Sequence, residues 1–198
     1  MAEQTAQFTI RRVETLDELR QVWAFAMPIL GLPQGKHTLQ YYMEKLAGAP
    51  QLLLFAQRDD RVCGCVLASL EGDHVLIGVA AVADDSRGMG IGRGMMKALE
   101  AGARERQQKV LLVSARQEAQ GFYLRCGFQP NLFVQVPEPD ALDRLMALSD
   151  GHEVVTKAQW DGRSKLMLLT PRIDSALEQK YRQQFPECVT QYVFLKHL

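Results

Sequence analysis

The sequence predicts an α/β fold whose sheet is mixed, and three observations support this. Short apolar runs that favour strands alternate with segments of helical periodicity along the 198 residues. A glycine-rich turn joins one of these runs directly to a helical segment in the middle of the chain. In the last third, six segments follow the order β-α-β-β-α-β.

Two helices are expected near the start of the chain, after a strand over residues 8–13. Thr15 and Glu18 have the spacing of a capping box, which predicts that the first helix begins there. Glycine and proline over residues 31–35 end this helix, and a second is predicted over residues 38–47. The apolar face of the first helix comprises Leu19, Val22, Trp23 and Ala26.

Strands dominate the next part of the chain. Asp59-Asp60 is the expected turn of a hairpin between the first two of them. The predicted elements are strands over residues 51–57, 61–70, 75–83 and 109–114, and a helix over residues 93–107.

The composition is that of an ordinary globular protein, with 47% hydrophobic and 23% charged residues. Lys plus Arg and Asp plus Glu each number 23, and the resulting zero net charge argues against a nucleic-acid or membrane-surface role. No apolar run could span a bilayer, the N-terminus shows no export signal, and four cysteines without a framework pattern indicate a reducing compartment. We therefore expect a cytoplasmic protein.

The glycine-rich turn carries the most specific chemical signal in the chain. Between a strand and a helix, its backbone N–H groups and the positive end of the helix dipole would form a phosphate site. A dinucleotide fingerprint and a Walker loop both fail on their glycine and lysine spacing, which leaves the pattern R-x-x-G-x-G. The turn comprises Arg87, Gly88, Met89, Gly90, Ile91, Gly92 and Arg93.

A second motif, A-x-x-F-Y-x-x-x-G-F, follows the next predicted strand. Gly127 is expected to end a helix in the left-handed conformation, with Phe128 packing back on it. The two motifs, in this order and with one strand between them, resemble the GNAT superfamily of N-acetyltransferases. The resemblance covers about residues 8–128. The second motif consists of Ala119, Phe122, Tyr123, Gly127 and Phe128.

The resemblance implies acetyl-CoA as co-substrate. The glycine-rich turn would hold its pyrophosphate, and the pantetheine arm would lie between the strands over residues 75–83 and 109–114, which splay at a bulge. The backbone of Ala80 and Val82 would donate to the arm, and an amide there would polarise the thioester carbonyl. The family often has Asn seven residues before its tyrosine, a position that Arg116 occupies here.

The same resemblance makes Tyr123 the candidate general acid that protonates the departing thiolate. The alternative is a core aromatic residue whose hydroxyl bonds a backbone carbonyl. The general base is less defined: His74, at the start of the central strand, titrates in the right range, and Glu71, Asp73 and Glu44 are nearby carboxylates. A water chain could serve in their place.

The tail from residue 131 leaves two interpretations open. It could be a separate small domain with a ferredoxin-like order, or its strands could complete the sheet of the core or form a homodimer contact. We favour the second, with a GNAT core over residues 1–130 and an extension over 131–198. Asp161-Gly162 is a predicted hairpin turn. The predicted strands of the tail are 132–136, 152–160, 165–170 and 190–196, and its helices 140–148 and 174–185.

These observations predict an N-acetyltransferase that moves an acetyl group from acetyl-CoA to a primary amine by direct attack in a ternary complex. The alternatives are an acyltransferase using another acyl-CoA and a non-catalytic coenzyme A-binding regulatory module. No metal site is predicted, because Cys63 and Cys65 lack C-x-x-C spacing and the histidines form no local pair. The acceptor, a small molecule or a protein, would meet the two N-terminal helices, the segment 30–37 between them, and the tail as a further candidate. The lining could include Trp23, Tyr41, Tyr42 and Glu44.

Overall fold

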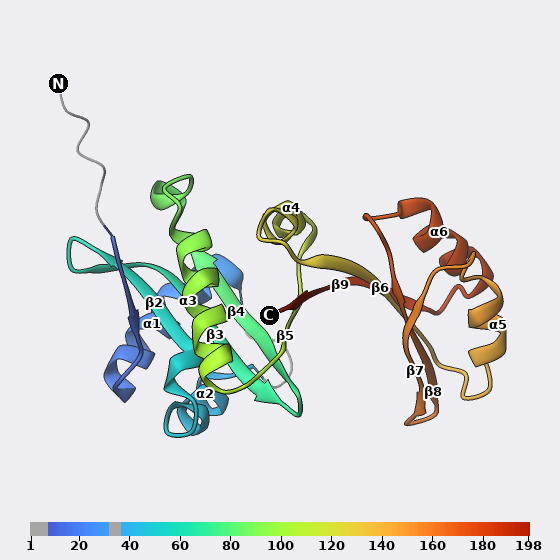
Figure 1. The fold of residues 1–198 in the computed structure, drawn as a ribbon, viewed down its shortest axis with the longest axis horizontal. Helices are drawn as coiled ribbons and strands as arrows, with labels where there is room; N and C mark the ends of the chain where they lie inside the picture. Colours follow the sequence, from blue (N-terminus) through green and yellow to red (C-terminus); the bar gives the residue numbers. More distant parts are fainter. Residues whose placement is uncertain (1–7, 32–36) are drawn as a thin grey trace. The chain divides into compact units, whose positions relative to one another are not determined.

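The computed structural model describes residues 8–31 and 37–198 and divides the chain into two units. One unit consists of residues 1–111 with 197–198, and the other of residues 112–196 (Figure 1). The division falls within strand β5 (Val110–Ser114). The predicted break at residues 31–35 lies almost wholly outside the described residues, as does the N-terminal segment in which no export signal was found.

The first unit contains an antiparallel sheet in the order β1-β2-β3-β4. Its strands are β1 (Thr9–Arg12), β2 (Leu53–Arg58), β3 (Arg61–Glu71) and β4 (His74–Val82). Asp59 and Asp60 both have positive φ in the β2–β3 turn, which confirms the predicted hairpin.

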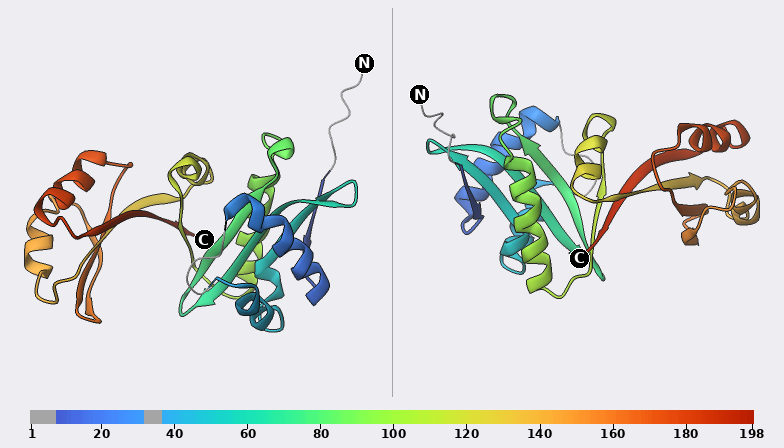
Figure 2. Two further views of the ribbon diagram at one scale, coloured as in Figure 1. Left: turned by 180° about the vertical axis from the view of Figure 1, so that it is seen from behind. Right: turned by 45° about the horizontal axis from the view of Figure 1, so that its top comes forward.

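Helices cover both faces of this sheet (Figure 2). They are α1 (Leu16–Leu30), α2 (Leu39–Leu46) and α3 (Ile91–Glu105). Cys65 and Leu67 of β3 pack in one core cluster with α1 and α2, whereas Gly64 faces Ile91 and Met95 of α3. Because alternate residues of a strand point to opposite faces, α3 lies on the other side of the sheet from α1 and α2.

The capping box predicted for α1 is present. The Thr15 hydroxyl accepts a hydrogen bond from the Glu18 N–H at 3.1 Å, and the Glu18 carboxylate accepts from the Thr15 N–H at 3.3 Å. The helix ends at Gly31, whose φ is 82°. By contrast, the predicted start of α3 at residue 93 is two residues late, because Gly90 already acts as its N-cap.

Gly102 of α3 packs directly on backbone. A side-chain carbon there would overlap the carbonyl oxygen of Gln51, in the short 3-10 helix η1 (Pro50–Leu52). Gly102→Ala is therefore expected to lower the free energy of unfolding by about 1–3 kcal/mol through overpacking, although alanine favours helix by about 1 kcal/mol.

Gly121→Ala, in α4, is the matched control for Gly102→Ala. The nearest atom to a carbon added at Gly121 is the movable Arg125 guanidinium at 3.3 Å. This variant should unfold at the same temperature or slightly above the wild type. Thermal melting of both variants tests the packing of α3, and a Gly102→Ala protein as stable as Gly121→Ala would contradict it.

The second unit contains the helices α4 (Gln117–Arg125), α5 (Leu142–Ala147) and α6 (Ser175–Gln184). Its strands are β6 (Gln129–Val136), β7 (Val154–Trp160), β8 (Arg163–Leu169) and β9 (Val189–His197). They pair antiparallel in the order β9-β6-β8-β7, so the first strand of the tail lies between the third and the last. The predicted β-α-β-β-α-β order and the Asp161-Gly162 turn are confirmed.

Contacts within the second unit join the tail to α4. The rings of Tyr123 and Phe194 of β9 have centroids 6.1 Å apart, and Lys196 Nζ donates to the Cys126 carbonyl at 2.7 Å. The two units divide at residues 111 and 112, earlier in the chain than the division predicted at residue 130, which stays a prediction. Within the described ranges, no helix is both long and apolar enough to cross a membrane.

Candidate active site

The glycine-rich turn follows β4 and a 3-10 turn, η2 (Asp84–Ser86), and leads into α3. Gly88 and Gly90 have φ values of 80° and 84°, in the left-handed region that favours glycine. Gly90 is the N-cap of α3 and supplies no capping side chain. The Gly94 N–H donates to the Gly90 carbonyl at 2.9 Å, the first intrahelical bond.

The N–H groups that precede this first bond have no acceptor within the helix. They belong to Ile91, Gly92 and Arg93. Together with the helix dipole they make the N-terminus of α3 favourable for an anion. A side-chain carbon added at Gly88 or Gly90 would meet no described atom within 4 Å, so the turn has open space beside it.

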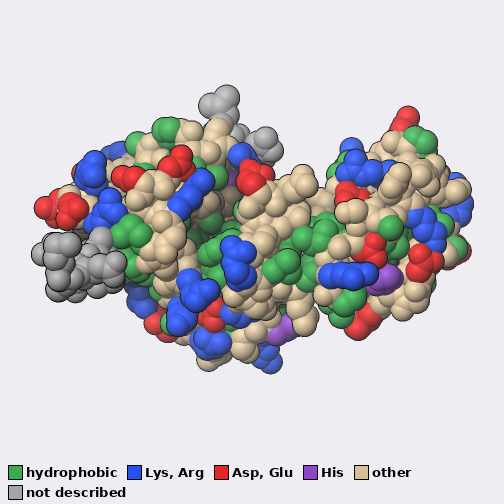
Figure 3. All heavy atoms as spheres, turned by 90° about the horizontal axis from the view of Figure 1, so that it is seen from above, with side chains coloured by type: hydrophobic (Ala, Val, Ile, Leu, Met, Phe, Trp, Pro, Cys, Tyr) green, Lys and Arg blue, Asp and Glu red, His purple; other side chains and the backbone are tan. Residues whose placement is uncertain are grey.

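Charged side chains around the turn pair with one another. The Arg87 guanidinium lies 2.8 Å from the Asp84 carboxylate, and both side chains are mostly exposed. On the face seen in Figure 3, basic side chains are scattered among acidic ones. Binding of a polyanion would therefore depend chiefly on backbone donors at the turn.

Arg58 is a residue near the turn that the sequence did not indicate. It ends β2, and its guanidinium donates to Met89 Sδ at 3.1 Å and lies 3.7 Å from the Asp85 carboxylate. Its side chain is only 18% exposed. The β2–β3 hairpin brings it to the turn, and no local motif signals that contact.

Strand β4 contains an irregularity at Gly78. Leu67 of β3 lies opposite Val79, and Ala68 lies opposite Ile77, so Gly78 has no residue opposite it. A bulge in this strand was expected from the family resemblance. Ala80 and Val82 remain in register with β3, and their contact with a cofactor stays a prediction.

The second motif ends α4 as predicted. The Phe128 N–H donates to the Tyr123 carbonyl and the Gly127 N–H to the Leu124 carbonyl, the two bonds of a Schellman motif. Gly127 has a φ of 83°, and the Phe128 ring packs edge-on against the Tyr123 ring.

Tyr123 is almost fully buried, with 4% of its surface exposed. Its ring also contacts Phe122 and Phe194. Burial is the main reason that the pKa of Tyr123 lies above its ordinary value, with a smaller contribution from Cys126. The hydroxyl therefore stays protonated over the usual working pH range and can act as a donor.

His74 lies at the first position of β4, opposite Glu71 in the β3–β4 ladder. Its Nδ1 is 3.3 Å from the carboxylate of Asp73, which is exposed. The structure also brings Tyr41 to Glu71, with the Tyr41 hydroxyl donating to the carboxylate at 2.6 Å. Of the other predicted lining residues, Glu44 accepts from Gln40 on the exposed side of α2.

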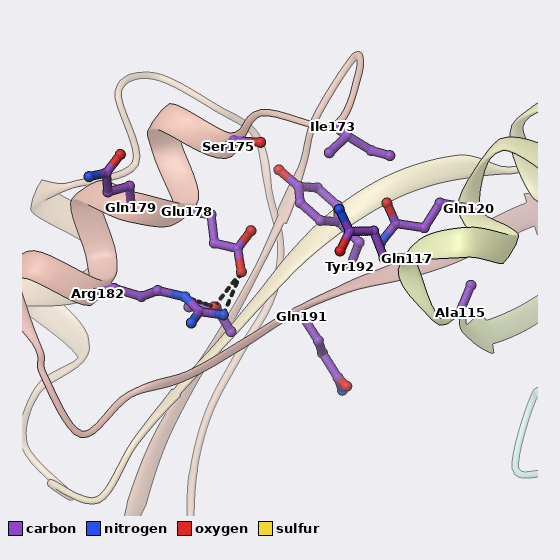
Figure 4. Close-up of a pocket in the computed structure, with 11 residues that line it drawn as sticks. Ala115, Gln117, Gln120, Ile173, Ser175, Glu178, Gln179, Arg182, Gln191 and Tyr192 are labelled. Atoms are coloured by element: carbon purple, nitrogen blue, oxygen red, sulfur yellow. Dashed lines mark hydrogen bonds and ion pairs between the residues drawn. The ribbon is translucent and has the colours of Figure 1, made fainter. Parts of the chain in front are cut away.

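A separate cavity of about 420 Å³ lies in the second unit, between α4, α6 and β9 (Figure 4). Arg182 in this cavity lies 2.8 Å from the Glu178 carboxylate and donates to the Thr190 hydroxyl. The Thr190 hydroxyl in turn donates to Glu178. This ion pair balances its own charge, so the cavity presents no net charge to a ligand.

A comparison with family models adds to this geometry. The model described as the acetyltransferase (GNAT) domain matches residues 50–130. This segment of the chain, somewhat less than half of its length, is therefore similar to the GNAT acetyltransferase domain. The matched range includes the glycine-rich turn and the motif around Tyr123, and the description of the model names no acceptor.

Solved structures share the fold of this chain and confirm the α/β class. N-acetylglutamate synthase from Neisseria gonorrhoeae, complexed with coenzyme A and N-acetyl-glutamate, has a TM-score of 0.55 at 15% identity. The match covers 98% of this chain but 35% of that one, so the chain spans about a third of the synthase. No curated protein sequence matches the chain.

Two further structures match over nearly their whole length. A candidate acetyltransferase from Pyrococcus horikoshii has a TM-score of 0.55 at 13% identity, over 100% of this chain and 91% of that one. A candidate N-acetyltransferase from Lactobacillus plantarum has a TM-score of 0.51 at 14% identity, over 96% and 98%. Identities this low are evidence of fold, and the acceptor has to be sought in the site.

Proposed function

We propose that the chain is a cytoplasmic N-acetyltransferase that moves an acetyl group from acetyl-CoA to a primary amine by direct attack in a ternary complex. The observation that carries the proposal is the uncapped N-terminus of α3 at Gly90, within the residues that match the GNAT domain model. Its orphan N–H groups and left-handed glycines fit a pyrophosphate. The N-acetylglutamate synthase that shares this fold is itself complexed with coenzyme A.

The residues of the turn supply the proposed cofactor site. The N–H groups of Ile91, Gly92 and Arg93 would donate to phosphate oxygens, and the open space beside Gly88 and Gly90 would admit them. Met89 belongs to the same turn, where Arg58 holds its sulfur. The exposed Arg87 would turn from Asp84 to a phosphate.

Other parts of the chain would act on the thioester. The backbone of Ala80 and Val82 would bind the pantetheine arm, and an amide there would stabilise the oxyanion. Tyr123 would give its proton to the thiolate as the carbon–sulfur bond breaks, since its hydroxyl is protonated before that step. His74 enters this proposal as the sequence-based candidate for the base that deprotonates the acceptor.

Gly90→Asp is expected to abolish the stabilisation by acetyl-CoA. The variant puts a side chain and a negative charge in the space proposed for the pyrophosphate. In the wild type, a ligand at 100 times its Kd stabilises the fold by about 2.7 kcal/mol, which appears as a rise in melting temperature. Thermal melting with and without millimolar acetyl-CoA measures this.

Gly162→Asp is the matched control for Gly90→Asp. Gly162 also has positive φ, 67°, and open space around it, but it lies in the β7–β8 turn. This control should keep the full acetyl-CoA shift despite similar backbone strain. Unchanged affinity in Gly90→Asp would place the phosphate site elsewhere, and a wild type without any shift would refute the cofactor assignment.

A further inference from the structure

The bulge at Gly78 accommodates two polar side chains. A carbon added at Gly78 would lie less than 3.0 Å from both the Tyr42 hydroxyl oxygen and His37 Nδ1. Any residue other than glycine would therefore displace the two groups from the backbone of β4. Both belong to the side of the sheet that α1 and α2 cover, where Tyr42 is fully buried.

His37 and Tyr42 contact each other directly. His37 Nδ1 and the Tyr42 hydroxyl oxygen are 3.0 Å apart, and the two rings are stacked with centroids 6.0 Å apart. The same hydroxyl donates to the Leu67 carbonyl at 3.3 Å, on β3 at the bulge. Burial raises the pKa of Tyr42, so the hydroxyl retains its single proton.

The position of that single proton sets the state of the imidazole, because the hydroxyl can donate to the Leu67 carbonyl or to His37 Nδ1. When Tyr42 donates it to the Leu67 carbonyl, the hydroxyl oxygen can only accept from the N–H at His37 Nδ1. The lone pair of the neutral imidazole is then on Nε2. In this arrangement Tyr42 orients His37 as a proton acceptor, in the way a general base is oriented by a third group.

A carboxylate lies beside the same aromatic rings. Glu71 accepts from the Tyr41 hydroxyl at 2.6 Å and from Ser69 Oγ at 3.2 Å. The Tyr41 ring packs edge-on against both His37, at 5.7 Å between centroids, and Tyr42, at 5.2 Å. The Tyr41 side chain therefore contacts both the Glu71 carboxylate, through its hydroxyl, and the His37 imidazole, through its ring.

We infer that His37 is the general base of the acetyl transfer, that Glu71 attracts the acceptor's ammonium group and that Tyr42 is a positioning residue for His37. The inference rests on the proposed function and names the proton acceptor and the charge of the substrate. It implies an acceptor that arrives as a cation.

The proton balance of the step is complete. The ammonium gives one proton to His37 Nε2, and the nitrogen then attacks the thioester carbonyl carbon. The carbon–nitrogen bond forms, and the carbon–sulfur bond breaks with its electron pair on sulfur. The nitrogen loses a second proton as the amide forms, the thiolate takes up one, and His37 releases its proton to solvent.

His37 fits this role better than the sequence-based candidate. The His74 imidazole has its Nδ1 directed at Asp73, whose side chain is fully exposed beside the β3–β4 turn. His37, in contrast, is part-buried and held by a buried hydroxyl. The sequence did not single out His37 as a base, because the contact with Gly78 depends on a bulge about forty residues away.

His37→Ala tests the inference in the full chain. With the best amine of a panel, kcat should fall by about 10²–10⁴, the range for loss of a general base, while the melting shift by acetyl-CoA persists. Added imidazole should restore part of the rate, because it can fill the space and take the proton. His197→Ala, at an exposed histidine, is the control. Its kcat should equal that of the wild type, and added imidazole should not raise it.

Gly78→Ala provides a second test that leaves both side chains in the sequence. The added methyl group should displace the His37 and Tyr42 side chains and lower kcat, again with acetyl-CoA binding retained. Gly48→Ala is its matched control, because the nearest atom to a carbon added there is 3.9 Å away. The Gly48→Ala rate should equal that of the wild type.

The outcomes separate this inference from the proposed function. If the wild type acetylates an amine and His37→Ala keeps kcat within a few-fold, or loses it without rescue by imidazole, His37 is not the base. If kcat falls and imidazole restores it in His74→Ala but not in His37→Ala, the base is His74. A wild type that binds acetyl-CoA but acetylates no amine refutes the proposed function and the inference with it.

Discussion

A chain truncated after Phe128 is expected to be insoluble or unfolded. The truncation removes β6, β8 and β9, whose buried side chains form most of the core of the second unit. Burying one leucine or phenylalanine is worth about 1.5–3 kcal/mol, so the loss exceeds the stability of an ordinary domain. Leu132, Val134, Leu166, Leu168 and Phe194 are each completely buried.

The part of the matched segment that remains after truncation would also lose contacts of its buried groups. Tyr123 and Phe128 would lose the Phe194 ring from their cluster, and the Cys126 carbonyl would lose the Lys196 donor. Circular dichroism and solubility of the fragment measure the effect. A soluble, folded fragment that still binds acetyl-CoA would show that the tail is a separate domain.

Tyr123→Phe is expected to lower kcat by about 10²–10⁴ while acetyl-CoA affinity changes little. The variant removes one hydroxyl and keeps the ring, so the packing against Phe122, Phe128 and Phe194 should persist. Steady-state rates with a good amine and the melting shift by acetyl-CoA measure the two effects separately.

The pH profile gives this variant a second readout. Burial raises the pKa of Tyr123, so the wild-type rate should fall only above the ordinary tyrosine pKa of about 10, where the acid loses its proton. That limb should be missing in Tyr123→Phe. Tyr192→Phe, which removes a buried hydroxyl bonded to Asp174 in the same unit, controls for the loss of a hydroxyl alone.

Three results would contradict the role of Tyr123 as the acid. A kcat within a few-fold of the wild type, with only a shift in melting temperature, would make it a core residue. Activity lost only through weaker cofactor binding would make it part of the wall of the pantetheine site. An equal loss in Tyr192→Phe would indicate a general effect on the fold.

Local sequence signals predicted most of the fold because each acts within a few residues. The capping box at Thr15 and Glu18 fixed the start of α1, and Gly127 ended α4 in the expected conformation. The sequence predicts the start of α3 too late, because glycines at a helix start look like part of the preceding loop when only the sequence is considered. Only contacts distant in sequence show how the tail strand β9 pairs with β6.

The glycine-rich turn before α3 was predictable for the same reason, because its glycines and the helix after it are contiguous. Three other contacts around the candidate site were not predictable. His37 meets Gly78 through a bulge, Tyr41 meets Glu71 across thirty residues, and Arg58 meets Met89 through a hairpin. Each pairing depends on strand register and tertiary packing, which no short motif encodes.

Thiol release from acetyl-CoA with a panel of amines tests the central claim most directly. At least one cationic amine should release coenzyme A in a one-to-one ratio with its acetylated product, identified by mass spectrometry. Gly90→Asp should abolish both signals. A wild-type protein that binds acetyl-CoA but releases no thiol with any amine would contradict the account and indicate a non-catalytic coenzyme A-binding module.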